Sequence, residues 1–412
     1  MSTEIRDATL LPDRQQAYYL DNAAREVDAR GLRDVPIIDC DSHCYETACL
    51  PEIIAYLEHP NIKRSFMFNS PMIVEPGLIS GNMGDRTVGG RLHQGGSKGG
   101  DETIYPIEQA YGDRHPVAAT TLRAMDAMGI DYTILFPTPM LNLGQNPDLA
   151  VRDELTWAFN RWLVEDVLPN DPRLLAMPLL PIHDPAQCLR NIEAFAGRPG
   201  VVGFMITCLQ YEPLHRNPYM KVFAELNERG LPVAFHSAPN WRERPFNVLD
   251  SFLGVHALGF PFYAMVQMTN IVLSGMPERF PNIRWIFMEA GQAWVPFCIA
   301  RLDNEYKQRS SEAPLLTRLP SEYIREFYFT TQPFESHERN ADTRAMFEMM
   351  NGGSTLLYAS DYPHQDFDTP TAIWDQPQFT ETERLAILGG NALGLFDLPV
   401  PVPAASVAGS AR

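Results

Sequence analysis

The chain has 412 residues, with 33 basic and 51 acidic side chains and a formal net charge of −18 at pH 7. Such a charge argues against a nucleic-acid-binding surface, because an acidic protein repels phosphates. The sequence has no apolar run of the roughly 20 residues that cross a membrane, and its first residues lack the pattern of a signal peptide. We therefore expect a cytoplasmic protein that binds neither nucleic acid nor membranes.

Changes in composition divide the chain into three parts. Residues 1–35 are polar and form an expected N-terminal arm, residues 36–396 form one large domain, and residues 397–412 are rich in Pro, Ala and Ser and are expected to be disordered. Inside the domain, residues 80–115 are rich in glycine and lack apolar periodicity. A loop of this length is either a lid over an active site or a mobile surface loop, and the sequence leaves both open.

Strand-like and helical patterns alternate along most of the chain. The sequence predicts strands at residues 36–41, 132–136, 174–180, 200–206, 231–236, 283–288, 327–331 and 355–360. It predicts helices at residues 115–129, 148–168, 185–196, 218–229, 256–280, 294–308, 341–350 and 381–395. The strands are apolar nearly throughout, which is typical of a parallel sheet covered by helices. The pattern predicts an α/β fold, a TIM-like (β/α)8 barrel with a long glycine-rich insertion after its first strand.

Residue types that bind metals follow four of these strands. Asp41 and His43 lie two positions apart at the end of the first strand, so their side chains point to the same side. His236 ends the fifth strand, Glu289 follows the sixth, and Asp361 follows the eighth. In such barrels the active site lies at the C-terminal ends of the strands, and imidazole with carboxylate donors suits zinc, manganese or iron. Each residue alone could be structural, but together they predict a divalent-metal site.

Four sequence motifs resemble those of the amidohydrolase-related family, which is part of the amidohydrolase superfamily. They are Asp41-x-His43, His236 after the fifth strand, Gly275-Met276-x-x-Arg279-Phe280-Pro281, and Ser360-Asp361-Tyr362-Pro363-His364. The family includes aminocarboxymuconate-semialdehyde decarboxylase and gamma-resorcylate decarboxylase, and the resemblance covers about residues 36–396. It implies a distorted barrel in which Asp41, His43, His236 and Asp361 hold a divalent metal, zinc or manganese.

One position departs from the decarboxylases that the sequence resembles. Those enzymes have a histidine at the end of strand six, where this chain has Glu289. A carboxylate there can act as a general acid or base, or it can bridge two metals. His256, between strands five and six, is either a ligand of a second metal or a substrate-binding or packing residue.

These residues lead to one main functional hypothesis and two alternatives. The main hypothesis is a metal-dependent decarboxylase (lyase) or hydrolase that acts on a small carboxylate-bearing substrate, with Asp361 as proton shuttle and Glu289 and His256 as further catalytic residues. The first alternative is a dinuclear iron/manganese oxygenase in which Glu289 and His256 serve a second metal. The second alternative is a metal-binding subunit of a hetero-oligomer whose chemistry takes place on another chain.

The expected partners are a small-molecule substrate and further protein subunits. Arg242, Tyr362 and His364 follow strand ends and are predicted to contact the substrate. A guanidinium suits this role because it binds a carboxylate through two parallel hydrogen bonds. The polar N-terminal arm is consistent with a homodimer or with a hetero-oligomer formed with a paralogue.

Overall fold

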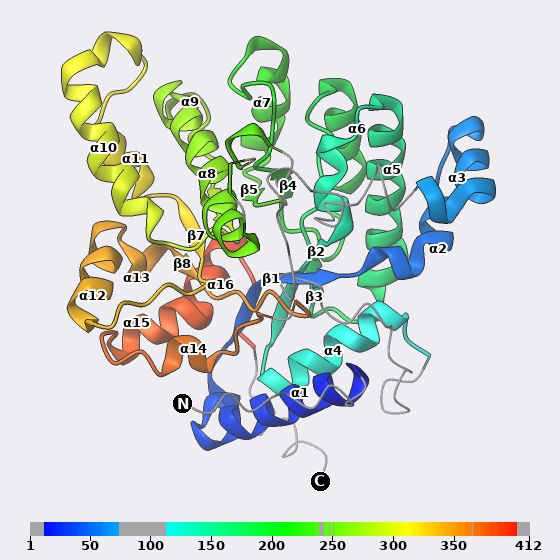
Figure 1. The fold of residues 1–412 in the computed structure, drawn as a ribbon, viewed down its shortest axis with the longest axis horizontal. Helices are drawn as coiled ribbons and strands as arrows, with labels where there is room; N and C mark the ends of the chain where they lie inside the picture. Colours follow the sequence, from blue (N-terminus) through cyan, green and yellow to red (C-terminus); the bar gives the residue numbers. More distant parts are fainter. Residues whose placement is uncertain are drawn as a thin grey trace.

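The structure is a computed structural model in which parallel strands lie at the centre and helices surround them (Figure 1). It describes residues 12–73, 113–238, 243–246, 248–249, 251–364 and 366–401. The predicted lid at residues 80–115 lies outside the described residues except for its last three positions, and so do residues 402–412 of the predicted tail.

The described part of the chain contains eight strands, one at each predicted position. They are β1 (Ile38–Cys44), β2 (Tyr132–Pro137), β3 (Leu174–Ala176), β4 (Phe204–Thr207), β5 (Val233–His236), β6 (Trp285–Met288), β7 (Tyr328–Thr330) and β8 (Leu356–Leu357). β1, β2 and β3 pair in this order in one sheet, and β4 to β8 pair in chain order in a second sheet. Every pair is parallel.

Backbone contacts join the two sheets at both junctions. Between β3 and β4, an isolated parallel bridge pairs Ala176 with Val201. Between β8 and β1, the N–H of Cys40 donates a hydrogen bond of 2.9 Å to the carbonyl of Tyr358. The strands therefore form a ring, and the predicted (β/α)8 barrel is confirmed.

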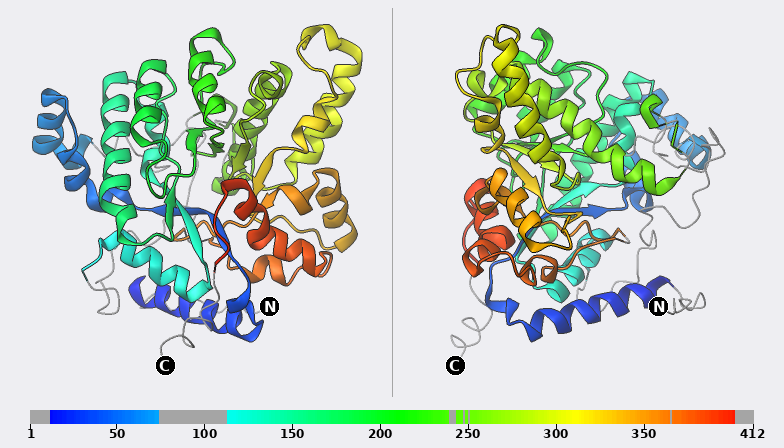
Figure 2. Two further views of the ribbon diagram at one scale, coloured as in Figure 1. Left: turned by 180° about the vertical axis from the view of Figure 1, so that it is seen from behind. Right: turned by 60° about the vertical axis from the view of Figure 1, so that its left-hand side comes forward.

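Helices lie around the outside of the ring (Figure 2). They are α1 (Pro12–Ala29), α2 (Leu50–Ala55), α3 (Pro60–Ile73), α4 (Pro116–Met128), α5 (Leu149–Trp162), α6 (Pro185–Phe195), α7 (Met220–Glu228), α8 (Phe252–Leu273), α9 (Met276–Arg279), α10 (Trp294–Arg309), α11 (Pro320–Ile324), α12 (Asn340–Met349), α13 (Gly352–Thr355), α14 (Thr371–Trp374), α15 (Glu381–Leu385) and α16 (Asn391–Phe396). The predicted helix at 256–280 is divided into α8 and α9, and a π-helical turn joins α15 to α16. No described helix is long and apolar enough to cross a membrane.

Helix α1 belongs to the predicted N-terminal arm and packs against α4, at the bottom of Figure 1. Its buried side is formed by Leu20, Ala23 and Val27, whose spacing of three and four residues places them on one face of a helix. The guanidinium of Arg33, just after the helix, donates to the backbone carbonyl of Asp126 in α4. The described part of the arm, from residue 12 onward, is thus fixed to the outside of its own barrel.

Alternation along the strands separates residues that pack against helices from residues that point into the barrel. The rings of Phe235 in β5 and Phe287 in β6 stack with centroids 5.4 Å apart, and the ring of Phe287 lies 6.0 Å from that of Trp294 in α10. These two phenylalanines therefore face the helices. Since successive residues of a strand point to opposite faces, His236 points into the barrel at the C-terminal end of β5.

Candidate metal centre

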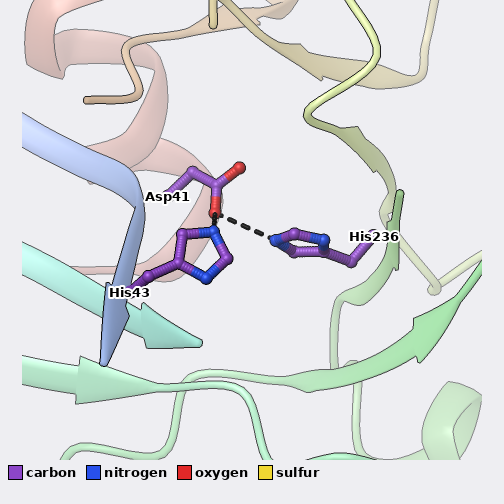
Figure 3. A group of neighbouring side chains, drawn as sticks. All are labelled: Asp41, His43 and His236. Atoms are coloured by element: carbon purple, nitrogen blue, oxygen red, sulfur yellow. Dashed lines mark hydrogen bonds and ion pairs between the residues drawn. The ribbon is translucent and has the colours of Figure 1, made fainter. Parts of the chain in front are cut away.

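Four predicted metal ligands meet at the C-terminal ends of β1, β5 and β8. Asp41 Oδ1 lies 3.1 Å from His236 Nε2 and 3.3 Å from His43 Nε2, and Figure 3 shows both rings turned toward this carboxylate. His43 Nε2 also lies 3.3 Å from Asp361 Oδ1. All four side chains are fully buried. The barrel thus brings together residues that are far apart in the sequence.

Backbone carbonyls fix the orientation of the two imidazoles. His43 Nδ1 lies 2.8 Å from the carbonyl oxygen of Pro137, and His236 Nδ1 lies 2.7 Å from that of Ser237. Because a carbonyl oxygen only accepts hydrogen bonds, each Nδ1 must carry the proton and donate it. The Nε2 atoms are then directed at Asp41 and, in neutral rings, have a lone pair free for a metal.

Charges inside the site shift the pKa values of its members strongly. Burial alone would raise the pKa of Asp41, but the charge and hydrogen bond of His236, together with His43, lower it to about 2. Burial alone would lower the pKa of His43, yet its contacts with Asp41 and the charge of Asp361 raise it to about 9. The pKa of His236 is raised as well, against the effect of burial, by the charge of Asp41. The buried carboxylates therefore attract positive charge to this point.

The residues present fit a divalent cation. Two buried atoms of these side chains, Asp41 Oδ2 and His43 Nε2, have no hydrogen-bond partner among the residues that the structure describes. Buried polar atoms normally have partners, so a pair of unpaired donor atoms in one place calls for a ligand. Donor atoms of Asp41, His43 and His236 lie within 4.8 Å of one another. Oxygen and imidazole donors of this kind suit zinc or manganese.

His364 lies among the side chains that could donate to a metal, whereas the sequence predicted that it contacts the substrate. Its Nδ1 is 2.5 Å from Asp361 Oδ1, and together with His43 these residues form a second cluster of donor atoms within 4.8 Å. The backbone of Asp361 has a φ of 60°, a left-handed conformation that tightens the turn after β8. The spacing of three residues between Asp361 and His364 was the signal in the sequence for this contact.

Glu289 and His256 belong to neither of the two donor clusters that the described residues form around Asp41 and Asp361. Glu289 Oε2 is 3.6 Å from His236 Nδ1, so its carboxylate faces the side of the ring that points away from Asp41. His256 lies on α8 with its ring 5.1 Å from that of Phe260, and it belongs to none of the donor clusters formed by the described residues. A second metal held by these two residues stays a prediction.

The two other predicted substrate contacts have different outcomes. Arg242 lies outside the described residues. Tyr362 is buried, and its carbonyl accepts a hydrogen bond of 2.7 Å from the backbone N–H of His43. This bond continues the junction between β8 and β1 up to the candidate metal centre, so Tyr362 contributes to the site through its backbone.

One buried carboxylate that the sequence reasoning missed holds this junction together. Asp39 accepts hydrogen bonds from the N–H of Ser360 at 2.8 Å, from the hydroxyl of Ser360 at 2.6 Å, from the N–H of Asp41 at 3.2 Å and from the hydroxyl of Thr133 at 3.3 Å. Burial raises its pKa to about 7, although the bonds from Ser360 lower it in part. An acidic residue inside an apolar strand, two positions before Asp41, was the available signal.

Comparison with known proteins identifies the family. The family model described as Amidohydrolase matches residues 38–398, which include all the strands described above. The chain therefore belongs to the amidohydrolase family.

Decarboxylases are prominent among the similar proteins. Gamma-resorcylate decarboxylase from Rhizobium sp. (strain MTP-10005) is 24% identical over 294 residues, which is 68% of this chain and 86% of the relative. The solved structure of 5-carboxyvanillate decarboxylase from Sphingomonas paucimobilis matches with a TM-score of 0.61 and 21% identity, over 89% of this chain and 100% of the other. A dihydroxybenzoic acid decarboxylase from Polaromonas sp. JS666, solved with bound manganese and the inhibitor 2-nitroresorcinol, matches with a TM-score of 0.59 and 18% identity, over 88% of this chain and 97% of the other.

These findings decide several of the predictions made from the sequence. The predicted family, the predicted barrel and the prediction of an enzyme of the amidohydrolase superfamily are confirmed. The individual site residues, the domain boundaries and the oligomeric state stay predictions.

Proposed function

We propose that this chain is a metal-dependent decarboxylase of an aromatic carboxylate that has a hydroxyl group beside the carboxylate. The observation that supports it most is the buried meeting of Asp41, His43, His236 and Asp361, in which two donor atoms have no hydrogen-bond partner among the described residues. The relatives suggest the reaction, because the curated relative and both solved structures are named decarboxylases. Their names also suggest the substrate class, since a dihydroxybenzoate is an aromatic hydroxy acid.

Asp41, His43, His236 and Asp361 would hold the metal, and manganese or zinc fits this set of donors. When bound, the cation supplies a Lewis acid that orients the substrate carboxylate with its neighbouring oxygen and neutralises negative charge. The protein itself supplies a buried surrounding in which such electrostatic interactions are stronger than in water.

Asp361 is the residue that we assign to proton transfer. Its Oδ1 lies 3.3 Å from His43 Nε2 and 2.5 Å from His364 Nδ1. In the decarboxylation, the ring carbon that carries the carboxylate takes a proton from Asp361, its bond to the carboxylate carbon breaks, and carbon dioxide leaves. His364 then returns a proton to Asp361, because the two side chains are in hydrogen-bond contact.

We assign Glu289 a positioning role beside His236. Its carboxylate lies 3.6 Å from His236 Nδ1. From this side it stabilises the Nδ1–H form of His236, which keeps Nε2 directed at Asp41. Glu289 therefore takes the position of the strand-six histidine of the decarboxylases but acts through a neighbouring imidazole.

The alternative function is a dinuclear iron/manganese oxygenase. The observation in its favour is that Glu289 and His364 add a carboxylate and an imidazole to the four proposed ligands. A site that offers more than four donors can hold two metals about 3.5–4 Å apart. A hydrolase would use the same four donors as a decarboxylase and would differ only in the substrate that it accepts.

Metal content and gas exchange test the proposal together. Protein purified without chelators is analysed for metals and incubated with 2,6-dihydroxybenzoate and 5-carboxyvanillate. We expect one divalent metal per chain and release of carbon dioxide without consumption of oxygen, and we expect Asp361→Asn to abolish the release. Two metals per chain that include iron, together with oxygen uptake, would overturn the proposal in favour of the oxygenase.

A further inference from the structure

Glu46 is a buried carboxylate close to the candidate metal centre that the proposed reaction does not use. It opens the short helix Glu46–Cys49 after β1 and has no exposed surface. Its Oε2 accepts a hydrogen bond of 3.0 Å from the N–H of Thr138, and its Oε1 accepts one of 2.6 Å from the N–H of Met140. Burying a charged carboxylate costs free energy, so we asked what Glu46 contributes at this position.

The two N–H groups belong to the turn that leaves β2, and this turn makes two contacts with the candidate metal centre. The carbonyl oxygen of Pro137 lies 2.8 Å from His43 Nδ1. The hydroxyl of Thr138 lies 3.3 Å from His364 Nε2, on the side of the ring opposite to Asp361. One turn therefore touches both imidazoles that flank Asp361.

One peptide unit joins Glu46 to His43. The carbonyl of Pro137 and the N–H of Thr138 belong to the same peptide group, which is planar and points these two groups in opposite directions. Glu46 holds the N–H end of this unit and His43 donates to its carbonyl end. Because the unit is rigid, a rotation that releases Glu46 also turns the carbonyl away from His43.

We propose that Glu46 is a positioning residue of the metal centre, which holds the Pro137–Met140 turn and through it sets the orientation of His43 and His364. The inference rests on the proposed metal site. The carbonyl of Pro137 keeps the proton of His43 on Nδ1 only while the turn is in place, and the hydroxyl of Thr138 keeps the ring of His364 facing Asp361. Outer partners of metal-binding histidines commonly act in this way.

Glutamine at position 46 tests the role with little change in shape. Both carboxylate oxygens of Glu46 accept from a backbone N–H, whereas a glutamine side chain offers one accepting oxygen and one NH2 group. Glu46→Gln therefore leaves either Thr138 or Met140 with a buried N–H that faces another donor, and the turn has to move.

Binding of Mn²⁺ to the metal-free protein is the measurement. The parent chain, Glu46→Gln and the control Glu58→Gln are titrated with Mn²⁺ by calorimetry, and the melting temperature of each metal-free protein is recorded. Glu58 provides the same chemical change at a place where the carboxylate contacts Arg190 and Trp157 instead of the turn. We expect Glu46→Gln to weaken Mn²⁺ binding about 10- to 100-fold and the control to bind as the parent does.

The outcomes separate this inference from the proposed function. A parent chain that binds no Mn²⁺ contradicts the proposed function. A parent that binds Mn²⁺ while Glu46→Gln melts earlier but binds equally well overturns the inference and leaves Glu46 a structural residue.

If Glu46→Gln does not fold, Mn²⁺ binding by the variant Thr138→Val tests the inference instead. This variant keeps the backbone N–H that Glu46 holds and replaces the hydroxyl that contacts His364 by a methyl group. Weaker Mn²⁺ binding with an unchanged metal-free melting temperature supports the inference, and unchanged binding overturns it.

Discussion

Asp39 and Ser360 are joined by two hydrogen bonds although 321 positions separate them in the sequence. The backbone N–H of Ser360 donates to one carboxylate oxygen at 2.8 Å and its hydroxyl donates to the other at 2.6 Å. The same carboxylate accepts from the N–H of Asp41. One side chain thus fixes the backbone beside both Asp41 and Asp361, the two carboxylates of the proposed metal site.

Removal of the Ser360 hydroxyl should weaken the whole junction. We expect Ser360→Ala to lower the free energy of unfolding by about 1.5–3 kcal/mol, because a buried hydrogen bond to a carboxylate is lost. Urea denaturation of the metal-free protein measures this change. Ser311→Ala, at an exposed position, serves as the control and should leave the free energy unchanged. Equal stability of the two variants would show that the contact contributes little.

Loss of one proposed ligand should remove both the metal and the activity. We expect His236→Ala to contain no bound divalent metal and to lose at least about a thousandfold in kcat/KM, since a Lewis acid contributes several kcal/mol. Elemental analysis and carbon dioxide release measure the two effects. His59→Ala changes an exposed histidine and should keep both. Full metal content in His236→Ala would contradict the assigned ligand set.

The stability of the metal-free protein should depend on pH through Glu46. Burial raises the pKa of Glu46 from 4.5 to about 7, against the effect of its backbone hydrogen bonds. The folded chain therefore holds this proton more tightly than the unfolded chain. The contribution to stability is fully present below pH 4.5, falls as the pH rises toward 7 and is lost above it. The loss amounts to about 3 kcal/mol, at 1.36 kcal/mol for each pKa unit.

A comparison with Glu46→Gln isolates this contribution, because the other titrating groups are common to both proteins. Urea denaturation with a chelator present, from pH 5 to pH 8, should show the parent losing stability relative to the variant as the pH rises. Parallel curves over this range would contradict the raised pKa.

The packing at the start of β4 should not tolerate a larger residue. A Cβ atom built at Gly203 would lie 2.7 Å from the carbonyl oxygen of Pro232 and 2.5 Å from Met177 Cε. We expect Gly203→Ala to lower the free energy of unfolding by about 1–3 kcal/mol. At Gly394 in α16 a Cβ would meet no atom within 4 Å, so Gly394→Ala should be neutral or stabilising by about 0.5–1 kcal/mol. Thermal denaturation of both variants checks the contrast.

Hydrophobic periodicity was sufficient to predict the eight strands and the longer helices between them, because buried parallel strands leave a continuous apolar signal. It did not predict the helices α2 and α3 that follow β1. The lengths were less predictable. β3 was expected at residues 174–180 but ends at Ala176, because Pro178 has no N–H to continue the ladder. The meeting of Asp41, His43, His236 and Asp361 followed from the rule that barrels collect their sites at the strand ends.

Contacts between distant segments could not be predicted in the same way. Asp39 and Ser360 come into contact only because β1 and β8 lie side by side. No local sequence pattern in either strand predicts this contact. The link from Glu46 to Thr138 depends on the geometry of a turn after β2, which periodicity does not specify. His364 was recognised as a polar residue near a strand end, but its contact with Asp361 depends on the left-handed backbone at that aspartate.

Because β8 has to pair with β1, the candidate metal centre can form only at a late stage of translation. Asp41 and His43 are made early, His236 later, and Asp361 near the last strand of the barrel. A growing chain on the ribosome therefore holds an incomplete set of donors until that strand has emerged and paired with the first. If the four proposed ligands hold a metal ion together, that ion would stabilise only chains whose barrel is already closed, because it would bind the native state and not its precursors.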